Sequence, residues 1–283
     1  MDPRSLTVEH DGLTIAALDW GGDGPPLLLQ HPNGFCAGLF DPLARELRDQ
    51  YRPVAVDVRG HGASDAPADL AACTFVDAAR DVLAVLDALG LEQVVALGQS
   101  LGGAAVVILD ALRPGIVRKA LLCEAIAFEV LSPGAVDPNP MAVAARRRRA
   151  VWPDRATVVA SYGSRPPFDL LEPSALAAYA RWGFHDLPDG TVTLACAPEV
   201  EARFFEAALE PDGAPFAFAH LPALQARVPV TIVSSTETNL RPEMFVEQAE
   251  RTGGAHHFVG GTHFFVQEDT ATAVSLVRAH LSW

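Results

Sequence analysis

Short apolar runs alternate with segments of helical periodicity along most of this chain. The runs are uniformly apolar and only a few residues long, as in Val94-Val95-Ala96-Leu97, which is typical of strands buried on both faces. Between such runs apolar residues recur every three or four positions, as they do from Phe75 to Leu89, and this spacing predicts helices. Strands that alternate with helices in this way predict a mostly parallel sheet covered by helices on both faces.

The N-terminal segment has a different pattern. Residues 6–20 alternate between apolar and polar positions around Asp11-Gly12, a dipeptide that favours two-residue turns, and this predicts a β-hairpin. The elements expected after the hairpin are strands at 27–30, 54–58, 93–97 and 117–123, and helices at roughly 38–50, 75–89 and 101–113.

The alternation of strands and helices stops after residue 127. Residues 128–220 are rich in proline and alanine and show helical patches, with no clear buried strand before about Thr191-Val192-Thr193-Leu194, and the earlier pattern resumes with a strand at 230–233. We therefore expect a core of residues 1–127 and 221–283, into which residues 128–220 are inserted as a mainly helical cap. The last elements expected are a helix near 242–252, a strand at 257–259 and a helix near 270–281.

Composition narrows the class of protein. The chain has 283 residues, of which 49% are apolar, so it can bury a large core. The formal net charge of −14 disfavours nucleic acids and anionic membranes as partners, and we expect a small-molecule substrate. The four cysteines are widely spaced, so neither a metal site nor a disulfide framework is expected, and no cofactor is implied. Without a signal-like or membrane-length apolar run, a cytoplasmic protein is expected, and a homo-oligomer is left open.

Gly98-Gln99-Ser100-Leu101-Gly102 is the motif that carries the most chemistry. It fits Gly-x-Ser-x-Gly and lies between an expected strand and an expected helix. A serine placed on such a tight strand-to-helix turn is lifted above the edge of the sheet, and the glycines allow the close packing that the turn needs. The motif in this context predicts that Ser100 is a nucleophile.

Four segments together resemble the α/β-hydrolase superfamily, and within it esterase-like and lysophospholipase-like proteins with a His-x-Asn-Gly-Phe loop. The resemblance covers the whole chain and implies that superfamily's fold: a mostly parallel, eight-stranded sheet with an inserted cap. The segments are His31-Pro32-Asn33-Gly34-Phe35, Asp57-Val58-Arg59-Gly60-His61-Gly62-Ala63-Ser64-Asp65, Gly98-Gln99-Ser100-Leu101-Gly102-Gly103 and Gly260-Gly261-Thr262-His263-Phe264-Phe265.

The resemblance implies a base and an acid beside Ser100. His263 lies where the superfamily presents its histidine, after a strand and before the last helix. The acid has two candidates. Glu124 closes an apolar strand, where an ionised carboxylate needs a partner because burying an unpaired charge is costly, and we favour it. Glu237 is the alternative, since the position after the seventh strand that usually holds aspartate is Thr238 here.

The resemblance also implies an oxyanion hole built from two backbone N–H groups. One is expected from Leu101, the residue after the nucleophile, and the other from the loop after His31. Asn33 is the better candidate there, with Phe35 as the alternative, because Pro32 has no N–H to donate. His31 and His61 are expected to have structural roles.

Two features of the expected cap are candidates for the binding site. The run Arg146-Arg147-Arg148-Arg149 is expected to form a solvated face, because successive helical residues point about 100° apart and cannot all line one pocket. A single arginine facing Ser100 would instead favour a substrate that carries a carboxylate. Trp152 and Trp182 are the first candidates for lining an acyl pocket.

The sequence therefore predicts a serine hydrolase that needs no metal and cleaves a carboxylic ester, thioester or lactone. Ser100 would attack, His263 would transfer the proton, Glu124 would orient the imidazole, and the amides of Asn33 and Leu101 would hold the oxyanion. Two alternatives remain. One is C–C bond hydrolysis of a β-diketone or ring-cleavage product with the same three side chains, and the other is a binding or signalling protein with little turnover.

Overall fold

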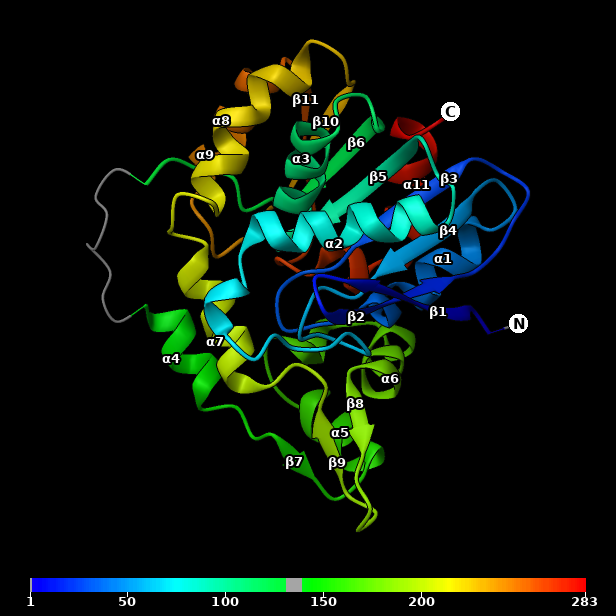
Figure 1. Cartoon of the computed structure of the whole chain (residues 1–283), viewed down its shortest axis with the longest axis vertical. Helices are drawn as coiled ribbons and strands as arrows, with labels where there is room; N and C mark the ends of the chain where they lie inside the picture. The colour runs from blue at the N-terminus through cyan, green and yellow to red at the C-terminus, as the bar shows by residue number, and fades with distance from the viewer. Residues whose placement is uncertain (1, 131–138) are drawn as a thin grey trace.

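An eight-stranded sheet forms the centre of the computed structural model, which describes residues 2–130 and 139–283 (Figure 1). The strand order is β1-β2-β4-β3-β5-β6-β10-β11, with β1 and β2 antiparallel to their neighbours and the other strands parallel. This confirms the mostly parallel sheet and the N-terminal hairpin. The strands are β1 (Arg4–His10), β2 (Leu13–Asp19), β3 (Pro26–Gln30), β4 (Arg52–Val56), β5 (Val94–Gln99), β6 (Val117–Cys123), β10 (Val230–Ser235) and β11 (Ala255–Val259).

Helices cover both faces of the sheet, as the uniformly apolar strands predict. One face packs against α2 (Phe75–Ala88), α3 (Leu101–Leu112), α8 (Ala214–Gln225) and α9 (Glu243–Thr252). The other face packs against α1 (Asp41–Leu47) and α11 (Thr270–His280). Shorter helical turns are η1 (Ala37–Phe40), η2 (Leu70–Ala72) and α10 (Phe265–Glu268). Within the described ranges, no helix combines the length and the apolar character needed to cross a membrane.

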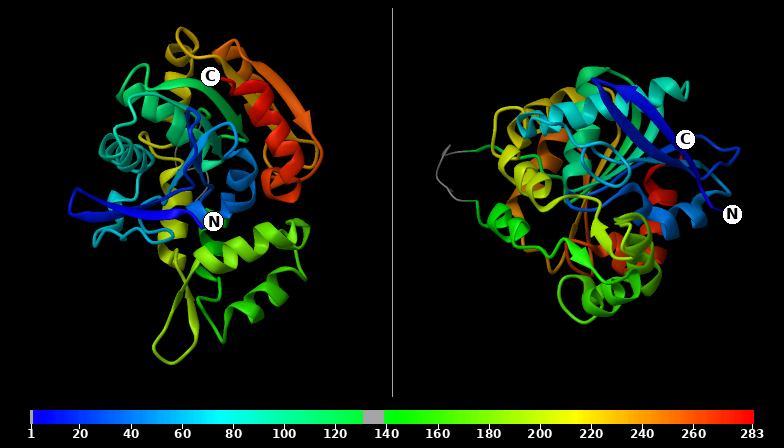
Figure 2. Two further views of the ribbon diagram at one scale, coloured as in Figure 1. Left: turned by 90° about the vertical axis from the view of Figure 1, so that its right-hand side faces the viewer. Right: turned by 60° about the horizontal axis from the view of Figure 1, so that its bottom comes forward.

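Residues 139–207, which precede α8, lie in the lower part of the molecule in Figure 1 and in the left view of Figure 2. They include a three-stranded antiparallel sheet of order β7-β9-β8, of which the sequence indicated only the strand near residues 191–194. The other two strands have two and three residues, too few for an alternating pattern to show in the sequence. The elements are α4 (Pro140–Arg146), β7 (Val151–Trp152), α5 (Arg155–Tyr162), η3 (Phe168–Leu170), α6 (Pro173–Trp182), β8 (Phe184–Asp186), β9 (Val192–Leu194) and α7 (Pro198–Ala207).

The structure moves one predicted boundary of this insertion. The division between residues 220 and 221 falls inside α8, a continuous helix whose buried residues join the same apolar core as α3 and α9. Because α8 packs against α3 and α9, which are both core helices, it is part of the core. At the other end, residues 131–138 of the expected cap lie outside the described residues.

Glu172, at the start of α6, connects the cap to the core. Its carboxylate accepts hydrogen bonds from the backbone N–H and the hydroxyl of Thr270, at 3.1 and 2.7 Å. Its own N–H donates to the carbonyl of Gln267 at 2.9 Å. The cap is therefore bonded to the segment that follows His263 in the chain.

The chain turns from β5 into α3 through one residue, Ser100, whose backbone angles are φ 58° and ψ −119°. The left-handed φ is unusual for a residue with a side chain and implies local strain. The neighbouring segments lie very close: a Cβ on Gly102 would come within 2.1 Å of the Gln30 carbonyl oxygen. Glycine at position 102 is required by this backbone contact.

We expect Gly102→Ala to lower the free energy of unfolding by about 3 kcal/mol, because the added methyl meets a backbone oxygen that cannot move aside. Urea unfolding measures the loss. Gly260→Ala is the control, since its Cβ has nothing within 4 Å, and it should change stability by less than about 1 kcal/mol. Equal stability of the two variants would contradict the packing at position 102.

Candidate active site

Ser100 lies at the carboxyl end of β5, between two strands whose ends hold other candidate residues. Its N–H donates to the carbonyl of Cys123 at 2.9 Å, and its carbonyl accepts from the N–H of Ile126 at 3.0 Å. Both bonds tie the turn to the end of β6, where Glu124 follows. Ser100 is 8% exposed. Open parallel sheets bind ligands at the carboxyl ends of their strands, and Ser100 lies at that edge.

His263 and Glu124, predicted from distant parts of the sequence, are hydrogen-bonded. The distance from His263 Nδ1 to Glu124 Oε2 is 2.6 Å. An ionised carboxylate only accepts hydrogen bonds, so Nδ1 carries the proton of the neutral imidazole. Nε2 is then unprotonated and able to accept a proton.

Glu124 is completely buried but well provided with donors. It accepts the N–H and the hydroxyl of Ser235 at 2.8 and 2.6 Å, and the hydroxyl of Thr238 at 2.8 Å. Burial raises the pKa of Glu124, but the hydrogen bonds from His263 and Ser235 outweigh it and hold the pKa below its ordinary value. The carboxylate is therefore ionised at neutral pH and oriented by bonds on both oxygens.

The two acid candidates differ clearly in position. Glu124 contacts His263, whereas Glu237 is exposed at the surface. Thr238, which occupies the position where an aspartate is usual, donates its hydroxyl to Glu124 instead of replacing it. The loop after β10 thus supports the acid presented by the neighbouring strand β6.

Gln99 is a site residue that sequence reasoning missed. Its Nε2 donates to the carbonyl of His263 at 2.9 Å, and its Oε1 accepts from Gln267 at 2.9 Å. The residue next to the serine therefore fixes the backbone of the histidine. The one signal in the sequence was its place inside the Gly-x-Ser-x-Gly motif.

The peptide between Pro32 and Asn33 is fixed by the core. His31 Nδ1 donates to the Pro32 carbonyl at 2.8 Å, while Nε2 accepts from the N–H of Val58 at 3.0 Å. In a planar trans peptide a fixed carbonyl also fixes the opposite N–H. The N–H of Asn33 is therefore held in one direction.

The candidate oxyanion donors differ in whether they are already occupied. The N–H groups of Asn33 and Leu101 donate to no group within residues 2–130 and 139–283. The N–H of Phe35, the alternative, donates to the Pro32 carbonyl at 3.3 Å. Leu101 also begins α3, where the helix dipole favours negative charge. Asn33 and Leu101 are thus the two free donors.

His61 has the structural role expected of it. Its Nδ1 lies 3.1 Å from the carbonyl of Arg59, and its Nε2 accepts the N–H of Gly34 at 3.0 Å. Burial lowers the pKa of His61 to about 3, with a smaller contribution from His31, whose own pKa burial lowers to about 4. Both imidazoles are neutral supports of the loop that holds Asn33.

Arg148 departs from the expectation of a solvated face. The other three arginines of the run are exposed, but the side chain of Arg148 is only 17% exposed and forms an ion pair with Glu201. It also donates to the hydroxyls of Tyr179 at 2.9 Å and Tyr162 at 3.3 Å. Gly34 lies directly against this cluster, since a Cβ there would come within 2.7 Å of Glu201 Oε1.

Of the two tryptophans expected at an acyl pocket, Trp152 is buried and Trp182 is half-buried. Trp152 is 4% exposed, belongs to the apolar core of the cap and donates Nε1 to the Arg149 carbonyl at 3.0 Å. Trp182 packs over Gly38, where an added Cβ would lie 2.1 Å from its ring. These contacts give both side chains a packing role.

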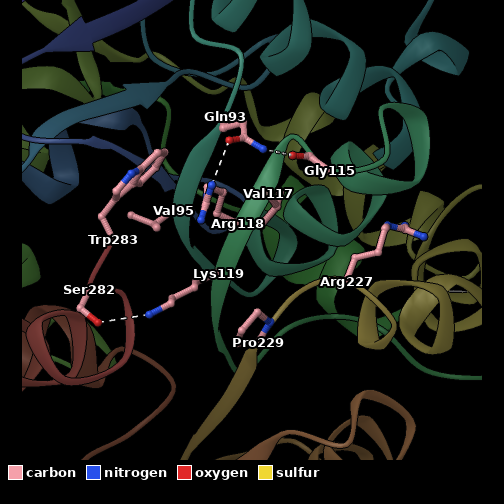
Figure 3. A pocket seen from close by; sticks show the side chains of 10 residues that line it. All are labelled: Gln93, Val95, Gly115, Val117, Arg118, Lys119, Arg227, Pro229, Ser282 and Trp283. Carbon is pink, nitrogen blue, oxygen red and sulfur yellow. Dashed lines mark hydrogen bonds between the residues drawn. The ribbon is translucent and has the colours of Figure 1, made fainter.

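Figure 3 shows a hollow at the surface that none of these residues lines. Its volume is about 360 Å³, and it opens at the amino ends of β5, β6 and β10, the sheet edge opposite Ser100. No candidate site residue lines it. In the described part of the chain, no three His, Cys, Asp or Glu side chains gather as metal ligands would. The residues that line the hollow are Gln93, Val95, Gly115, Val117, Arg118, Lys119, Arg227, Pro229, Ser282 and Trp283.

Comparison with known proteins gives one family. The family model described as alpha/beta hydrolase fold matches residues 25–220. Protein Rv2715 of Mycobacterium tuberculosis, described as uncharacterized, is 37% identical over 83 residues, 29% of this chain and 24% of that protein. The 3-oxoadipate enol-lactonase 1 of Acinetobacter baylyi is 36% identical over 99 residues, 35% of this chain and 36% of the lactonase. The match therefore spans only about a quarter of the first curated relatives.

Among solved structures, E-2-(acetamidomethylene)succinate hydrolase is similar over nearly the whole length. The TM-score is 0.82 at 21% identity, covering 99% of this chain and 100% of that one. At this level of identity the likeness concerns the fold, and it includes the inserted segment.

The neutral histidines predict a specific dependence of stability on pH. The unfolded chain binds a proton at His61 as the pH falls through the ordinary value of 6.5, whereas the folded protein does so only near pH 3. The stability that His61 contributes is therefore lost as the pH falls below 6.5. Between pH 7 and pH 5, the free energy of unfolding of the wild type should fall by about 2 kcal/mol more than that of His61→Gln. Urea unfolding at both pH values measures this, and identical slopes would refute it.

Proposed function

This chain belongs to the α/β-hydrolase family, and we propose that it is a serine hydrolase that cleaves a carboxylic ester, thioester or lactone. The observation that carries the proposal is the pairing of His263 with the buried Glu124 at the strand ends where Ser100 is presented. A histidine with its Nδ1 proton held by a carboxylate has its Nε2 free to act as a base.

In the proposed reaction Ser100 Oγ attacks the substrate carbonyl, and its proton passes to His263 Nε2. The carbonyl oxygen becomes negatively charged and is held by the N–H groups of Asn33 and Leu101. The bond to the leaving alcohol, thiol or ring oxygen then breaks, and that group takes the proton from His263. Water adds to the acyl-enzyme by the same steps, releasing the acid and free Ser100.

The environment of Arg148 favours this substrate class over the C–C hydrolysis of ketone-bearing acids. A substrate carboxylate would need an arginine whose charge is available. Arg148, which adjoins the oxyanion loop, already has Glu201 as counterion and bonds to two tyrosine hydroxyls.

Ser100→Ala should reduce hydrolysis of the best ester, thioester or lactone of a substrate panel by more than about 10³-fold, because nucleophile and base act as a unit. A fluorophosphonate probe should label the wild type at Ser100 and fail to label the variant. Unchanged thermal unfolding is the control for folding. Activity above a few per cent in a folded variant would exclude Ser100, and an unlabelled wild type would favour a binding protein.

Glu124→Gln should lower kcat by at least about 10²-fold, since an amide facing Nδ1 no longer holds the imidazole in the required tautomer. Glu237→Gln, an equivalent change at an exposed carboxylate, should leave kcat within about twofold. Steady-state kinetics on the same substrate compares them. The reverse ranking would transfer the role of the acid to Glu237.

A further inference from the structure

The oxyanion loop, residues 31–35, is held by the cap as well as by the core. Tyr179 of α6 donates its hydroxyl to the Gly34 carbonyl at 3.2 Å. Asn33 Nδ2 donates to the backbone carbonyl of Glu201 in α7 at 2.9 Å. The residue whose N–H is proposed to bind the oxyanion is therefore bonded to the cap through its own side chain, and the carbonyl of the next residue is bonded to the cap as well.

Arg148 determines how Tyr179 can bond. A guanidinium only donates, so the Tyr179 oxygen that receives its N–H, at 2.9 Å, acts as the acceptor in that bond. The single hydroxyl proton is then directed to the Gly34 carbonyl. Glu201, bonded to the other end of the guanidinium, fixes Arg148 in turn. A continuous chain of hydrogen bonds therefore connects the Glu201 carboxylate, through Arg148 and the Tyr179 hydroxyl, to the Gly34 carbonyl of the loop.

The ion pair is too buried to be explained as a surface contact. The side chains of Arg148 and Glu201 are 17% and 10% exposed, whereas Arg146 pairs with Glu199 and Glu206 at the surface. Burying both charges costs solvation, so such a pair is weak evidence for stability in itself. Its geometry instead defines the position of a loop that must be placed within about half an ångström to stabilise a transition state.

We propose that Arg148, Glu201 and Tyr179 form a clamp through which the cap positions the Asn33 N–H for the oxyanion. The inference rests on the proposed function. None of the three is assigned contact with the substrate, so they are positioning residues. The clamp makes stabilisation of the transition state depend on the position of the cap relative to the core. Attack by Ser100 and proton transfer to His263 depend on core residues alone.

Tyr179→Phe tests the clamp with the loss of one oxygen atom. Tyr162→Phe is the matched control, because Tyr162 also accepts a bond from Arg148 but is not bonded to the loop. Tyr179→Phe should lower kcat about 10-fold with KM changed less than about twofold, since deletion of an oxyanion donor costs 10²–10³-fold and a displaced one less. Tyr162→Phe should leave both constants within about twofold.

An alkyl trifluoromethyl ketone separates positioning from simple packing. Ser100 Oγ adds to its carbonyl carbon, the proton goes to His263, and the carbonyl oxygen becomes an oxyanion bound by the same N–H groups. Affinity for this ketone should fall by the same factor as kcat/KM in Tyr179→Phe. Affinity for the product acid should remain unchanged, which a merely structural role would not produce.

The double variant Arg148→Met/Glu201→Gln removes both buried charges together, so that neither is left unpaired. It should reproduce the loss of kcat and of ketone affinity, whereas Arg146→Met, which breaks only surface ion pairs, should not.

If the folded Tyr179→Phe and double variants keep wild-type kcat and ketone affinity while the wild type is labelled at Ser100, the clamp is refuted and the proposed function stands. If the wild type neither hydrolyses the substrate panel nor is labelled, the proposed function fails and the clamp with it.

Discussion

The left-handed backbone at Ser100 is the constraint on which the rest of the site depends. Holding a serine in this conformation costs on the order of 1–3 kcal/mol, which surrounding contacts must offset. They do so through bonds from Ser100 to Cys123 and Ile126, which fasten the turn to the end of β6. The same bonds bring Ser100 next to Glu124, so the strained turn is fastened to the segment that presents the acid.

Much of the fold could be predicted because the parallel sheet leaves a strong local signal. Buried strands such as β5 are apolar at nearly every position, and this distinguishes them from the helices between them. Glu124 was favoured for a related physical reason, since a carboxylate that closes an apolar strand needs a partner. The structure supplies that partner as His263, which lies 139 positions away in the sequence.

The sequence did not reveal features that depend on contacts between distant segments. The inward turn of Arg148 depends on Glu201 of α7 and Tyr179 of α6, which have no fixed spacing from it in the sequence. Gln99 reaches the His263 carbonyl only because β5 and the histidine loop meet at the same edge. The sequence indicated only one strand of the small cap sheet, near residues 191–194, because the other two are too short to show a period. Local patterns determine elements, whereas these features depend on how the elements are assembled.

The bonds of Glu172 to Thr270 and Gln267 also limit the mechanical freedom of the cap. A rigid body fixed at one point keeps three rotations, but one fixed at two separate points keeps a single rotation, about the line between them. Glu172 is one such point, and the bonds from Tyr179 and Glu201 to residues 33–34 form the other. The line between them passes beside the histidine loop and the oxyanion loop, and rotation of the cap about it is opposed by further contacts, the bond from Arg203 Nε to the Leu70 carbonyl and the ion pair of Arg181 with Asp2. Displacement is smallest near an axis of rotation, so the polar groups that act on the substrate lie where the cap moves least.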